Sequence, residues 1–412
     1  MIIFNYVKIA KKKVITMEYN FSDKVRPLKP SAIREMFKVL SQPGMIALSA
    51  GNPSCESFPT EAFAKLSAEI FKDEANVALQ YGITEGYMPL REKIAKRLKE
   101  KFGIGREFDN VTVVSGGQQG IELACKVLCN EGDVVLCECP SFIGALNSFR
   151  SYGVKLVGIE MDGDGLIPES LEAAIEANKS AKVLYTIPTF QNPMGVTLTL
   201  ERRKRVYEIC KKNGIVIIED NPYGELRFDG EDVPTIKSMD TEGIVVYCGS
   251  FSKTLSSGMR VGFVCAPDEI SQKMVVCKQV ADVHTNLFFQ MLINKYLENY
   301  DFDEHIAGIR ALYRRKCSLM LSEMDKSFPE GVTYTRPQGG LFIWCTLPEY
   351  VDVDAFCKRC LENKVAVVTG KTFLPDTSAV THSFRINYST PSDENIIEGI
   401  ARLAKTLNEF VK

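Results

Sequence analysis

The chain alternates short apolar runs with longer amphipathic stretches between about residues 110 and 267. The apolar runs are rich in valine and isoleucine, which favour strands. Because near-continuous apolar strands are typical of parallel sheets covered on both faces, the pattern predicts an α/β domain with a mostly parallel sheet. The predicted strands are VTVVSGG, VVLCECP, VLYTIP, IVIIED, IVVYCGS and VGFVCAP.

Helix signals stand between these strands and again after residue 300. IELACKVLCN and LERRKRVYEICKKNG are amphipathic, and the second ends at Gly214 with lysines in its last turn. A long charged helix is expected over roughly residues 303–326. The strand-like runs GGLFIWCTL, KVAVVTG and SFRINYS follow it, which indicates a second, smaller α+β domain.

A chain of 412 residues is too long for one hydrophobic core. We expect a large domain over residues 61–300 and a small C-terminal domain over residues 301–412. Residues 17–60 have no clear core pattern and are assigned to an N-terminal arm that belongs to the small domain. Residues 1–16 lack the apolar region of a signal peptide and are expected to be a disordered extension or a start-site artefact.

Composition excludes several classes of protein. Hydrophobic residues make up 45% and charged residues 25% of the chain, which is ordinary for a globular protein. A formal net charge of −2 provides no basic surface for nucleic acid. No apolar run approaches the roughly 18 residues that a membrane span needs. We therefore expect neither a nucleic-acid partner nor a membrane partner.

The thirteen cysteines do not form an obvious disulfide or metal pattern. Most lie in apolar runs, where a reduced cysteine behaves as a small hydrophobic residue. Cys357 and Cys360 form a CxxC pair, but no second pair or nearby histidine completes a zinc site. A cytoplasmic protein without a metal ion is expected.

Two predicted strand ends carry glycine and asparagine motifs. In a doubly wound sheet, ligands bind at the carboxyl ends of the strands. The motif SGGQQG, residues 115–120, is either a tight turn or a phosphate site, because glycines and a helix start expose backbone N–H groups. The motif FQNPMG, residues 190–195, is a turn signal, and Asn192 can also donate its amide to a ligand oxygen.

A third strand end carries a carboxylate. Asp220 ends the strand IVIIED, and Tyr223 follows three residues later. Asp220 and Asn221 can simply begin the turn before Pro222. Alternatively, Asp220 is a carboxylate in a low-dielectric strand end, where a bound cation would balance its charge.

The fourth strand end is GSFSKTLSSGMR, residues 249–260. A loop lysine such as Lys253 is usually solvated. However, Ser250, Ser252 and Arg260 supply two hydroxyls and a planar cation that suit a phosphate. A lysine beside a phosphate site can form a Schiff base with an aldehyde cofactor. Together, the four strand ends offer the groups that pyridoxal 5'-phosphate needs.

These motifs resemble the class I/II aminotransferases of fold type I, in the branch of 2-aminoadipate, kynurenine and multi-substrate aminotransferases. The chain is also similar to the aminotransferase-like domain of GntR-type regulators. The resemblance covers about residues 24–410 and implies a large domain with a mostly parallel seven-stranded sheet between helices, plus a smaller α+β domain. It rests on SAIREMF, AGNPSCESFP, QYGITEGYMPLR, SGGQQGIELACK, FQNPMG, EDNPYGELRF, GSFSKTLSSGMRVG, RPQGGLFIW and FRINYS, in this order.

The resemblance implies a role in cofactor binding for several residues. Lys253 would bind pyridoxal 5'-phosphate covalently and move the α-proton of the substrate. Asp220 would pair with the pyridine nitrogen, while Asn192 and Tyr223 would reach the ring oxygen. The residues expected to hold the phosphate are Gly117, Gln118, Ser250, Ser252 and Arg260.

The resemblance also implies a substrate site and a homodimer. Arg385 would bind the substrate α-carboxylate through two parallel N–H groups, with Asn192 and Gly51 nearby. Arg34 would lie over the site, and Tyr81 matches a tyrosine that the family supplies from the neighbouring subunit. Where the family usually has tyrosine, this sequence has Phe142. Its ring can still stack on the cofactor, but it cannot supply a hydroxyl.

The function implied is an aminotransferase that works by a ping-pong mechanism. The donor would be an L-amino acid (2-aminoadipate, aromatic or branched-chain), and the acceptor a 2-oxo acid such as 2-oxoglutarate. A β-lyase or decarboxylase on the same fold would use the same cofactor set and stays an alternative. A ligand-sensing regulator is a less favoured alternative. Such a protein would carry a winged helix-turn-helix before this domain, and the present chain does not have the basic charge that DNA binding favours.

Overall fold

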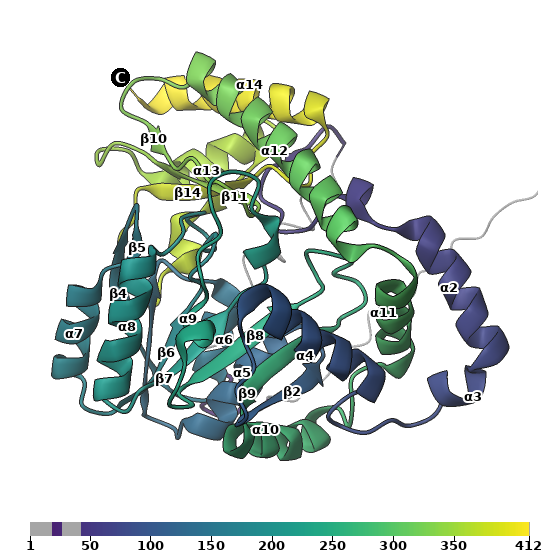
Figure 1. Cartoon of the computed structure of the whole chain (residues 1–412). Helices are drawn as coiled ribbons and strands as arrows, with labels where there is room; N and C mark the ends of the chain where they lie inside the picture. Colours follow the sequence, from purple (N-terminus) through teal and green to yellow (C-terminus); the bar gives the residue numbers. More distant parts are fainter. Residues whose placement is uncertain (1–18, 27–42, 412) are drawn as a thin grey trace, which may run out of the picture.

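The computed structural model describes residues 19–26 and 43–411 and contains a large and a small sheet with helices around both (Figure 1). The order in the large sheet is β2-β9-β8-β7-β6-β3-β4-β5. Its strands are β2 (Asp109–Val114), β3 (Val134–Cys139), β4 (Lys155–Asp162), β5 (Gly165–Leu166), β6 (Ala181–Thr186), β7 (Val216–Asp220), β8 (Val245–Ser250) and β9 (Gly262–Pro267).

The large sheet is mostly parallel, as predicted. The strands from β8 through β7, β6 and β3 to β4 pair in parallel, whereas β9 is antiparallel to both β2 and β8. The six predicted strands are confirmed. Two more were not predicted: β4, in which only Ile159 is fully buried, and the two-residue β5, which pairs antiparallel with β4. The sheet therefore has eight strands rather than seven.

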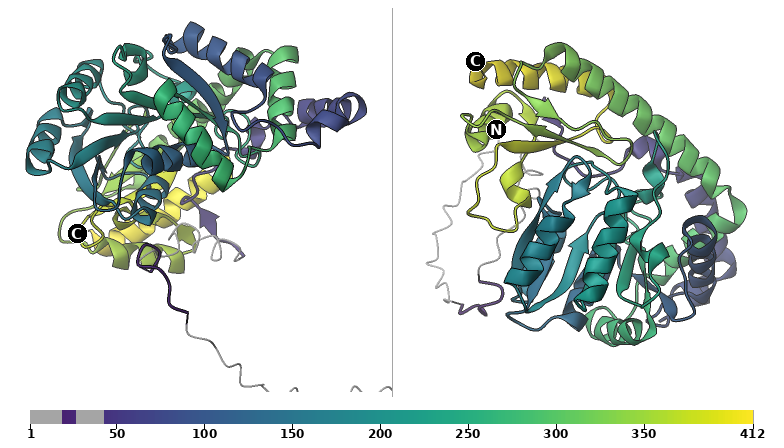
Figure 2. Two further views of the ribbon diagram at one scale, coloured as in Figure 1. Left: turned by 90° about the horizontal axis from the view of Figure 1, so that it is seen from below. Right: turned by 60° about the vertical axis from the view of Figure 1, so that its left-hand side comes forward.

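Helices cover both faces of the large sheet (Figure 2). Alternation along the strands divides the core, because Val183 and Ile218 belong to one cluster and Leu184 and Ile217 to the other. The helices on the first face are α5 (Gly117–Leu128), α6 (Ile143–Ser151) and α10 (Asp268–Ala281). Those on the second face are α7 (Pro168–Ala177), α8 (Leu200–Lys212) and α9 (Ile236–Met239).

A further group of helices lies beside the large sheet. α2 (Thr60–Asp73) and α4 (Met88–Phe102) both pack against α11 (Leu287–Asn299), and the short α3 (Ala75–Ala78) follows α2. In Figure 1, α2 and α3 project from the body of the molecule. Three short 3₁₀ helices, η1 (Cys55–Ser57), η2 (Gly224–Leu226) and η3 (Gly370–Phe373), lie in loops.

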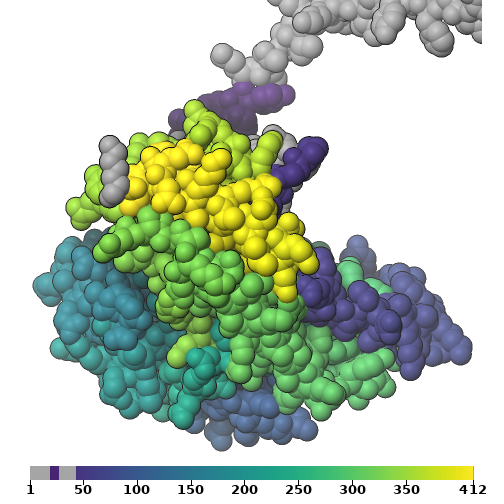
Figure 3. Space-filling view, turned by 90° about the horizontal axis from the view of Figure 1, so that it is seen from above, coloured from purple at the N-terminus to yellow at the C-terminus, as the bar shows by residue number. Residues whose placement is uncertain are grey.

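The small sheet is antiparallel, in the order β10 (Thr333–Tyr334), β11 (Phe342–Thr346), β14 (Ser383–Asn387) and β13 (Val368–Thr369). The predicted long helix is α12 (Phe302–Ser327), which packs beside α14 (Asp393–Phe410) (Figure 3). α13 (Val353–Glu362) also packs on α14. The predicted fold class, α/β with a smaller α+β part, is confirmed.

The N-terminal segment joins the C-terminal part of the chain. β1 (Ile46–Ala47) pairs in parallel with β12 (Val365–Ala366). The division at residues 60 and 300 stays a prediction, and residues 1–16 lie outside the described residues. Among the helices that the structure describes, none has the length and apolarity needed to cross a membrane.

Candidate active site

A cavity of about 470 Å³ lies at the carboxyl ends of the large-sheet strands. Residues of the N-terminal segment, the large sheet and the small sheet all line it. Twelve of the predicted site residues are among them: Gly51, Gly117, Gln118, Phe142, Asn192, Asp220, Tyr223, Ser250, Ser252, Lys253, Arg260 and Arg385. The fold thus brings together positions that are up to 334 residues apart in the sequence, from Gly51 to Arg385.

Lys253 follows β8 and points into this cavity. Its Nζ donates a hydrogen bond of 2.7 Å to the carbonyl oxygen of Gly51. Burial lowers the pKa of the Lys253 amine to about 8, and the positive charges of Arg385 and Arg260 act in the same direction against the attraction of Asp220. A substantial fraction of this amine is therefore neutral near pH 8, and a neutral amine can act as a nucleophile or a base.

Asp220 ends β7 with a buried carboxylate. Burial raises its pKa to about 7, although a hydrogen bond from Tyr185 and the charge of Lys253 oppose the change. The Tyr185 hydroxyl donates to Asp220 Oδ2 at 2.8 Å. The negative charge of Asp220 is thus costly in this environment unless a cation is bound beside it. A protonated pyridine nitrogen would supply such a cation.

The loop before α5 and the segment after Lys253 meet at one end of the cavity. α5 begins at Gly117, so its first backbone N–H groups are not used within the helix. Arg260 Nη2 donates to the carbonyl oxygen of Ser115 at 3.2 Å, and its Nη1 lies 3.5 Å from the hydroxyl of Ser252. A helix start, a guanidinium and hydroxyl groups together form a site suited to a phosphate.

Two glycines permit this close approach. Gly116 belongs to the predicted motif SGGQQG, whereas no role is predicted for Gly262 from the sequence. A Cβ atom on Gly116 would lie 2.1 Å from Arg260 Nη2, and Gly116 has a φ of +82°. A Cβ atom on Gly262 would lie 2.7 Å from the backbone nitrogen of Gly117. Neither contact can be read from the sequence, because it depends on how β9 and α5 pack.

Gln118 and Phe142 line the same side of the cavity. The side-chain amide of Gln118 donates to the carbonyl oxygen of Gly144 at 2.9 Å, so it is directed at α6. Phe142 immediately precedes α6, and its ring lies over Gly144, where an added Cβ would be 2.4 Å from the ring. Phe142 therefore presents an aromatic face at the position where the family usually has tyrosine.

Arg385, on β14, is almost fully buried in the cavity wall. Its Nη1 donates to Asn192 Oδ1 at 2.8 Å and its Nη2 to the carbonyl oxygen of Ser49 at 3.0 Å. Asn192 in turn lies 3.5 Å from the hydroxyl of Tyr223. No carboxylate in the part of the chain that the structure describes pairs with Arg385.

The charge of Arg385 is consequently uncompensated. Its Nε is buried without a hydrogen-bond partner, and its guanidinium carbon lies 4.1 Å from the ring centre of Phe342. Burial lowers the pKa of Arg385 to about 10. A ligand carboxylate would supply both the missing charge and the missing acceptor.

One predicted residue does not line the cavity, and another cannot be placed relative to it because it lies outside the described residues. Tyr81 is 80% exposed, and its ring meets His284 edge-on at a centroid distance of 5.9 Å. Arg34 lies outside the described residues. No motif singled out Ser49 or Tyr185, although Ser49 is two residues from the predicted Gly51.

The residues present fit pyridoxal 5'-phosphate in three separate respects. The helix start with Arg260 suits the phosphate, and the buried carboxylate of Asp220 suits a protonated ring nitrogen. The amine of Lys253 lies in the same cavity. The uncompensated charge of Arg385 remains for a substrate carboxylate.

Comparison with known proteins identifies the family of this chain. The family model for aminotransferase class I and II matches residues 43–403. Aromatic-amino-acid aminotransferase 1 of Thermococcus litoralis is 38% identical over 403 residues, which cover 96% of each chain. The 2-aminoadipate transaminase of Thermus thermophilus is 37% identical, covering 92% of this chain and 94% of its own.

A solved structure agrees with these relatives. The kynurenine aminotransferase of Pyrococcus horikoshii superposes with a TM-score of 0.91 at 38% sequence identity, over 95% of this chain and 98% of its own. Both the sequence and the fold are therefore shared over nearly the whole chain. The chain belongs to the class I and II aminotransferases, and it is an enzyme that uses pyridoxal 5'-phosphate to transfer amino groups between amino acids and 2-oxo acids.

Proposed function

We propose that the cavity around Lys253 is the active site, and that the donor is an L-amino acid with an aromatic, branched-chain or 2-aminoadipate side chain. The observation that carries this proposal is the position of one amine, one carboxylate and one uncompensated guanidinium in a single cavity. The acceptor is a 2-oxo acid such as 2-oxoglutarate, and the two half-reactions follow each other in a ping-pong cycle.

The cofactor, when bound, supplies an electron sink for the electrons of the substrate α-carbon. Asp220 would keep its ring nitrogen protonated, and Asn192 and Tyr223 would bind its ring oxygen. Phe142 would pack against its ring. Gly117, Gln118, Ser250, Ser252 and Arg260 would hold its phosphate.

Lys253 would hold the cofactor covalently in the resting enzyme, and its amine would carry the proton of the substrate α-carbon. Because burial and two neighbouring arginines lower the pKa of this amine to about 8, it can accept a proton from the α-carbon and return it. The hydrogen bond from Lys253 Nζ to Gly51 holds the amine inside the cavity.

Arg385 binds the α-carboxylate of the substrate. Its two terminal nitrogens are already fixed by Asn192 and Ser49, so the guanidinium is held in one orientation before the substrate arrives. Phe342 and Ile187 give the neighbouring wall an apolar character that suits an aromatic or branched side chain. Arg34, outside the described residues, is the candidate cation for a second substrate carboxylate.

The active form is proposed to be a homodimer in the cytoplasm. The five large apolar residues Phe71, Val77, Leu79, Tyr81 and Ile83 are all 48% or more exposed, which is unusual for one stretch of a monomer. A second copy of the chain would cover them and place Tyr81 in its active site. All thirteen cysteines are free thiols, which is common in proteins of a reducing compartment.

The test is half-transamination of the enzyme loaded with pyridoxal 5'-phosphate. The protein is mixed with aromatic, branched-chain and acidic amino acids, and conversion of the cofactor absorbance to that of pyridoxamine phosphate is recorded. We expect conversion with aromatic donors and its complete loss in Lys253→Ala. Lys273→Ala, which removes an exposed lysine of α10, is the matched control and should behave as the wild type.

Borohydride reduction followed by peptide mass analysis locates the covalent bond independently. The proposal requires the pyridoxyl group on Lys253. It is overturned if the group is found on another lysine, or if no amino acid converts the absorbance. Pyruvate and ammonia formed from cysteine conjugates without any 2-oxo acid would instead favour the lyase reaction.

A further inference from the structure

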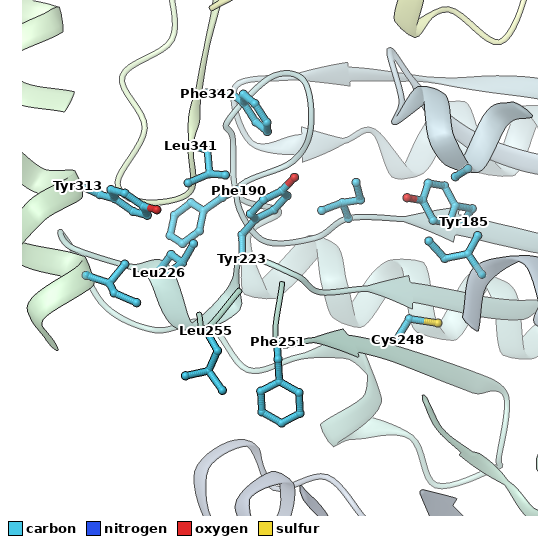
Figure 4. Packing of buried hydrophobic residues seen from close by; sticks show 14 of the residues in the cluster. Tyr185, Phe190, Tyr223, Leu226, Cys248, Phe251, Leu255, Tyr313, Leu341 and Phe342 are labelled. Atoms are coloured by element: carbon cyan, nitrogen blue, oxygen red, sulfur yellow. The ribbon is translucent and has the colours of Figure 1, made fainter. Parts of the chain in front are cut away.

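Tyr185 is a buried residue whose hydroxyl reaches the carboxylate of Asp220 from behind the cavity. Its side chain is fully buried and is not among the residues that line the cavity. In Figure 4 its hydroxyl points toward the side where Tyr223 and Phe342 lie. The hydroxyl donates to Asp220 Oδ2 at 2.8 Å. Tyr185 therefore contacts Asp220 from outside the cavity.

The strand register explains how Tyr185 reaches this position. β6 and β7 are parallel, and Tyr185 pairs with Ile218, two residues before Asp220. Side chains alternate along a strand, so Tyr185, Ile218 and Asp220 all point to the face covered by α5 and α6. The ring of Tyr185 meets Phe149 of α6 edge-on, with ring centres 5.4 Å apart. Its hydroxyl is thus held in place by a packed ring.

The two oxygens of Asp220 face different neighbours. Oδ2 accepts the hydrogen bond from Tyr185, whereas Oδ1 lies 3.9 Å from the position that a Cβ on Gly117 would occupy. Gly117 is the first residue of α5 and lines the cavity. The terminal torsion of an aspartate is broad and weakly restrained on its own. The hydrogen bond therefore fixes which oxygen remains free for a ligand.

Tyr185 also influences the charge of Asp220. Burial and the neighbouring Glu138 on β3 raise the pKa of Asp220, whereas the hydrogen bond from Tyr185 and the charge of Lys253 lower it. Burial raises the pKa values of Tyr185, Tyr223 and Cys248, so these groups stay neutral. A hydroxyl that cannot ionise acts only as a donor here, and such a donor favours the anionic carboxylate.

We propose that Tyr185 is a positioning residue of the transamination reaction. Its hydroxyl holds Asp220 with one oxygen turned into the cavity and keeps that carboxylate anionic, so that the ring nitrogen of pyridoxal 5'-phosphate stays protonated. The inference rests on the proposed role of Asp220 in the active site. It adds a residue whose chemistry the apolar strand VLYTIP does not reveal.

The test is Tyr185→Phe in the cofactor-loaded enzyme, because this change removes only the hydroxyl. The protein is loaded with pyridoxal 5'-phosphate labelled with nitrogen-15, and the chemical shift of the ring nitrogen is followed against pH. We expect the ring nitrogen to lose its proton at a pH at least about one unit lower than in the wild type. The rate of half-transamination should fall about tenfold, with the donor KM changed less than about twofold.

Tyr388→Phe is the matched control. Tyr388 is equally buried, and its hydroxyl donates to the carbonyl oxygen of Gly339 at the same distance of 2.8 Å. Both variants remove one buried hydrogen bond, so both should lower the unfolding temperature. Only Tyr185→Phe should move the nitrogen titration.

A double-mutant cycle keeps the proposal falsifiable if the loss of stability complicates the comparison. In an Asp220→Asn background the carboxylate is absent, and adding Tyr185→Phe should produce no further fall in rate. Equal and additive effects in the two backgrounds, or a wild-type nitrogen titration in Tyr185→Phe, would overturn the role of Tyr185. If the wild type itself converts with no amino acid, the proposed function fails, which is a distinct result.

Discussion

At the scale of single residues, one physical cause shifts two ionisable groups of the cavity in opposite directions. Burial disfavours charge, so it lowers the pKa of Lys253 to about 8 and raises that of Asp220 to about 7. Arg385 is a third buried charge, and among the described residues no carboxylate pairs with it. The cavity without ligands therefore holds three charges that a cofactor and a carboxylate substrate would compensate.

This arrangement predicts how the stability of the cofactor-free protein depends on pH. The pKa of Asp220 rises from 3.8 in the unfolded chain to about 7 in the folded protein. The folded state therefore holds the proton more tightly. The stabilisation of the folded state by this proton is fully present below pH 3.8 and is lost as the pH rises through 7.

Asp220→Asn removes this dependence, because the amide does not ionise. We expect the cofactor-free variant to gain stability relative to the wild type as the pH rises from 4 to 7, with a limit of roughly 4 kcal/mol. Urea unfolding of both proteins at several pH values measures the difference. The comparison ends at pH 7 because the charge of Asp220 acts on Lys253, so the titration of that amine near pH 8 also differs between the two proteins. A difference that stays constant with pH would contradict the prediction.

At the scale of elements, the sequence predicts what is local and misses what depends on packing. The six strands with near-continuous apolar runs were predicted because both of their faces are buried. β4 was missed because only Ile159 on it is fully buried. Lys253 and Asp220 were recognisable from motifs at strand ends. Tyr185 and Gly262 were not, because their importance arises only when β7 meets β6 and when α5 meets β9.

The contact between α5 and β9 gives a prediction of its own. A Cβ on Gly262 would lie 2.7 Å from the backbone nitrogen of Gly117, 2.8 Å from the carbonyl carbon of Gly116 and 2.9 Å from the carbonyl oxygen of Gly249. All three atoms belong to the backbone and cannot move aside as a side chain would. Gly262→Ala should therefore displace the start of α5, where the phosphate is proposed to bind.

We expect Gly262→Ala to raise the dissociation constant of pyridoxal 5'-phosphate by roughly tenfold, since such overpacking typically costs about 1–3 kcal/mol. Titration of the cofactor-free protein, followed by absorbance, measures this change. Gly308→Ala is the control, because nothing lies within 4 Å of its added Cβ in α12. It should leave cofactor affinity unchanged and stabilise the helix by up to about 1 kcal/mol. Unchanged affinity in Gly262→Ala would argue against a phosphate at this helix start.

At the scale of the whole molecule, a single chain supplies most of the proposed site and leaves Tyr81 outside it. Asn192, Ser49 and Arg385 come from three separate parts of the chain and still form one hydrogen-bonded group. Tyr81 is 80% exposed and does not line the cavity of its own chain. The sequence predicts a homodimer only through a family resemblance, because no local pattern reports which surface a partner covers.

Mixed dimers test whether Tyr81 acts in the neighbouring subunit. One subunit carries Lys253→Ala and the other Tyr81→Ala, and two affinity tags allow the mixed dimer to be purified. If Tyr81 acts across the interface, one site of this dimer contains both an intact Lys253 and an intact Tyr81. We expect about half of the wild-type activity per dimer, because one of the two sites is intact. The homodimer of Lys253→Ala and the homodimer of Tyr81→Ala should each be far less active than this mixed dimer.

The reciprocal mixed dimer makes the test decisive. One subunit is wild type and the other carries both Lys253→Ala and Tyr81→Ala, so the same two side chains are lost from the dimer. If sites form across the interface, the site with the intact Lys253 then contains the Tyr81→Ala change, and activity should be lost. If Tyr81 served its own subunit, the outcomes would be reversed, and the double variant would give the half-active dimer. Because Tyr81 is so exposed in the single chain, its removal should leave folding of each subunit intact, and the two mixed dimers differ only in which subunit carries the change.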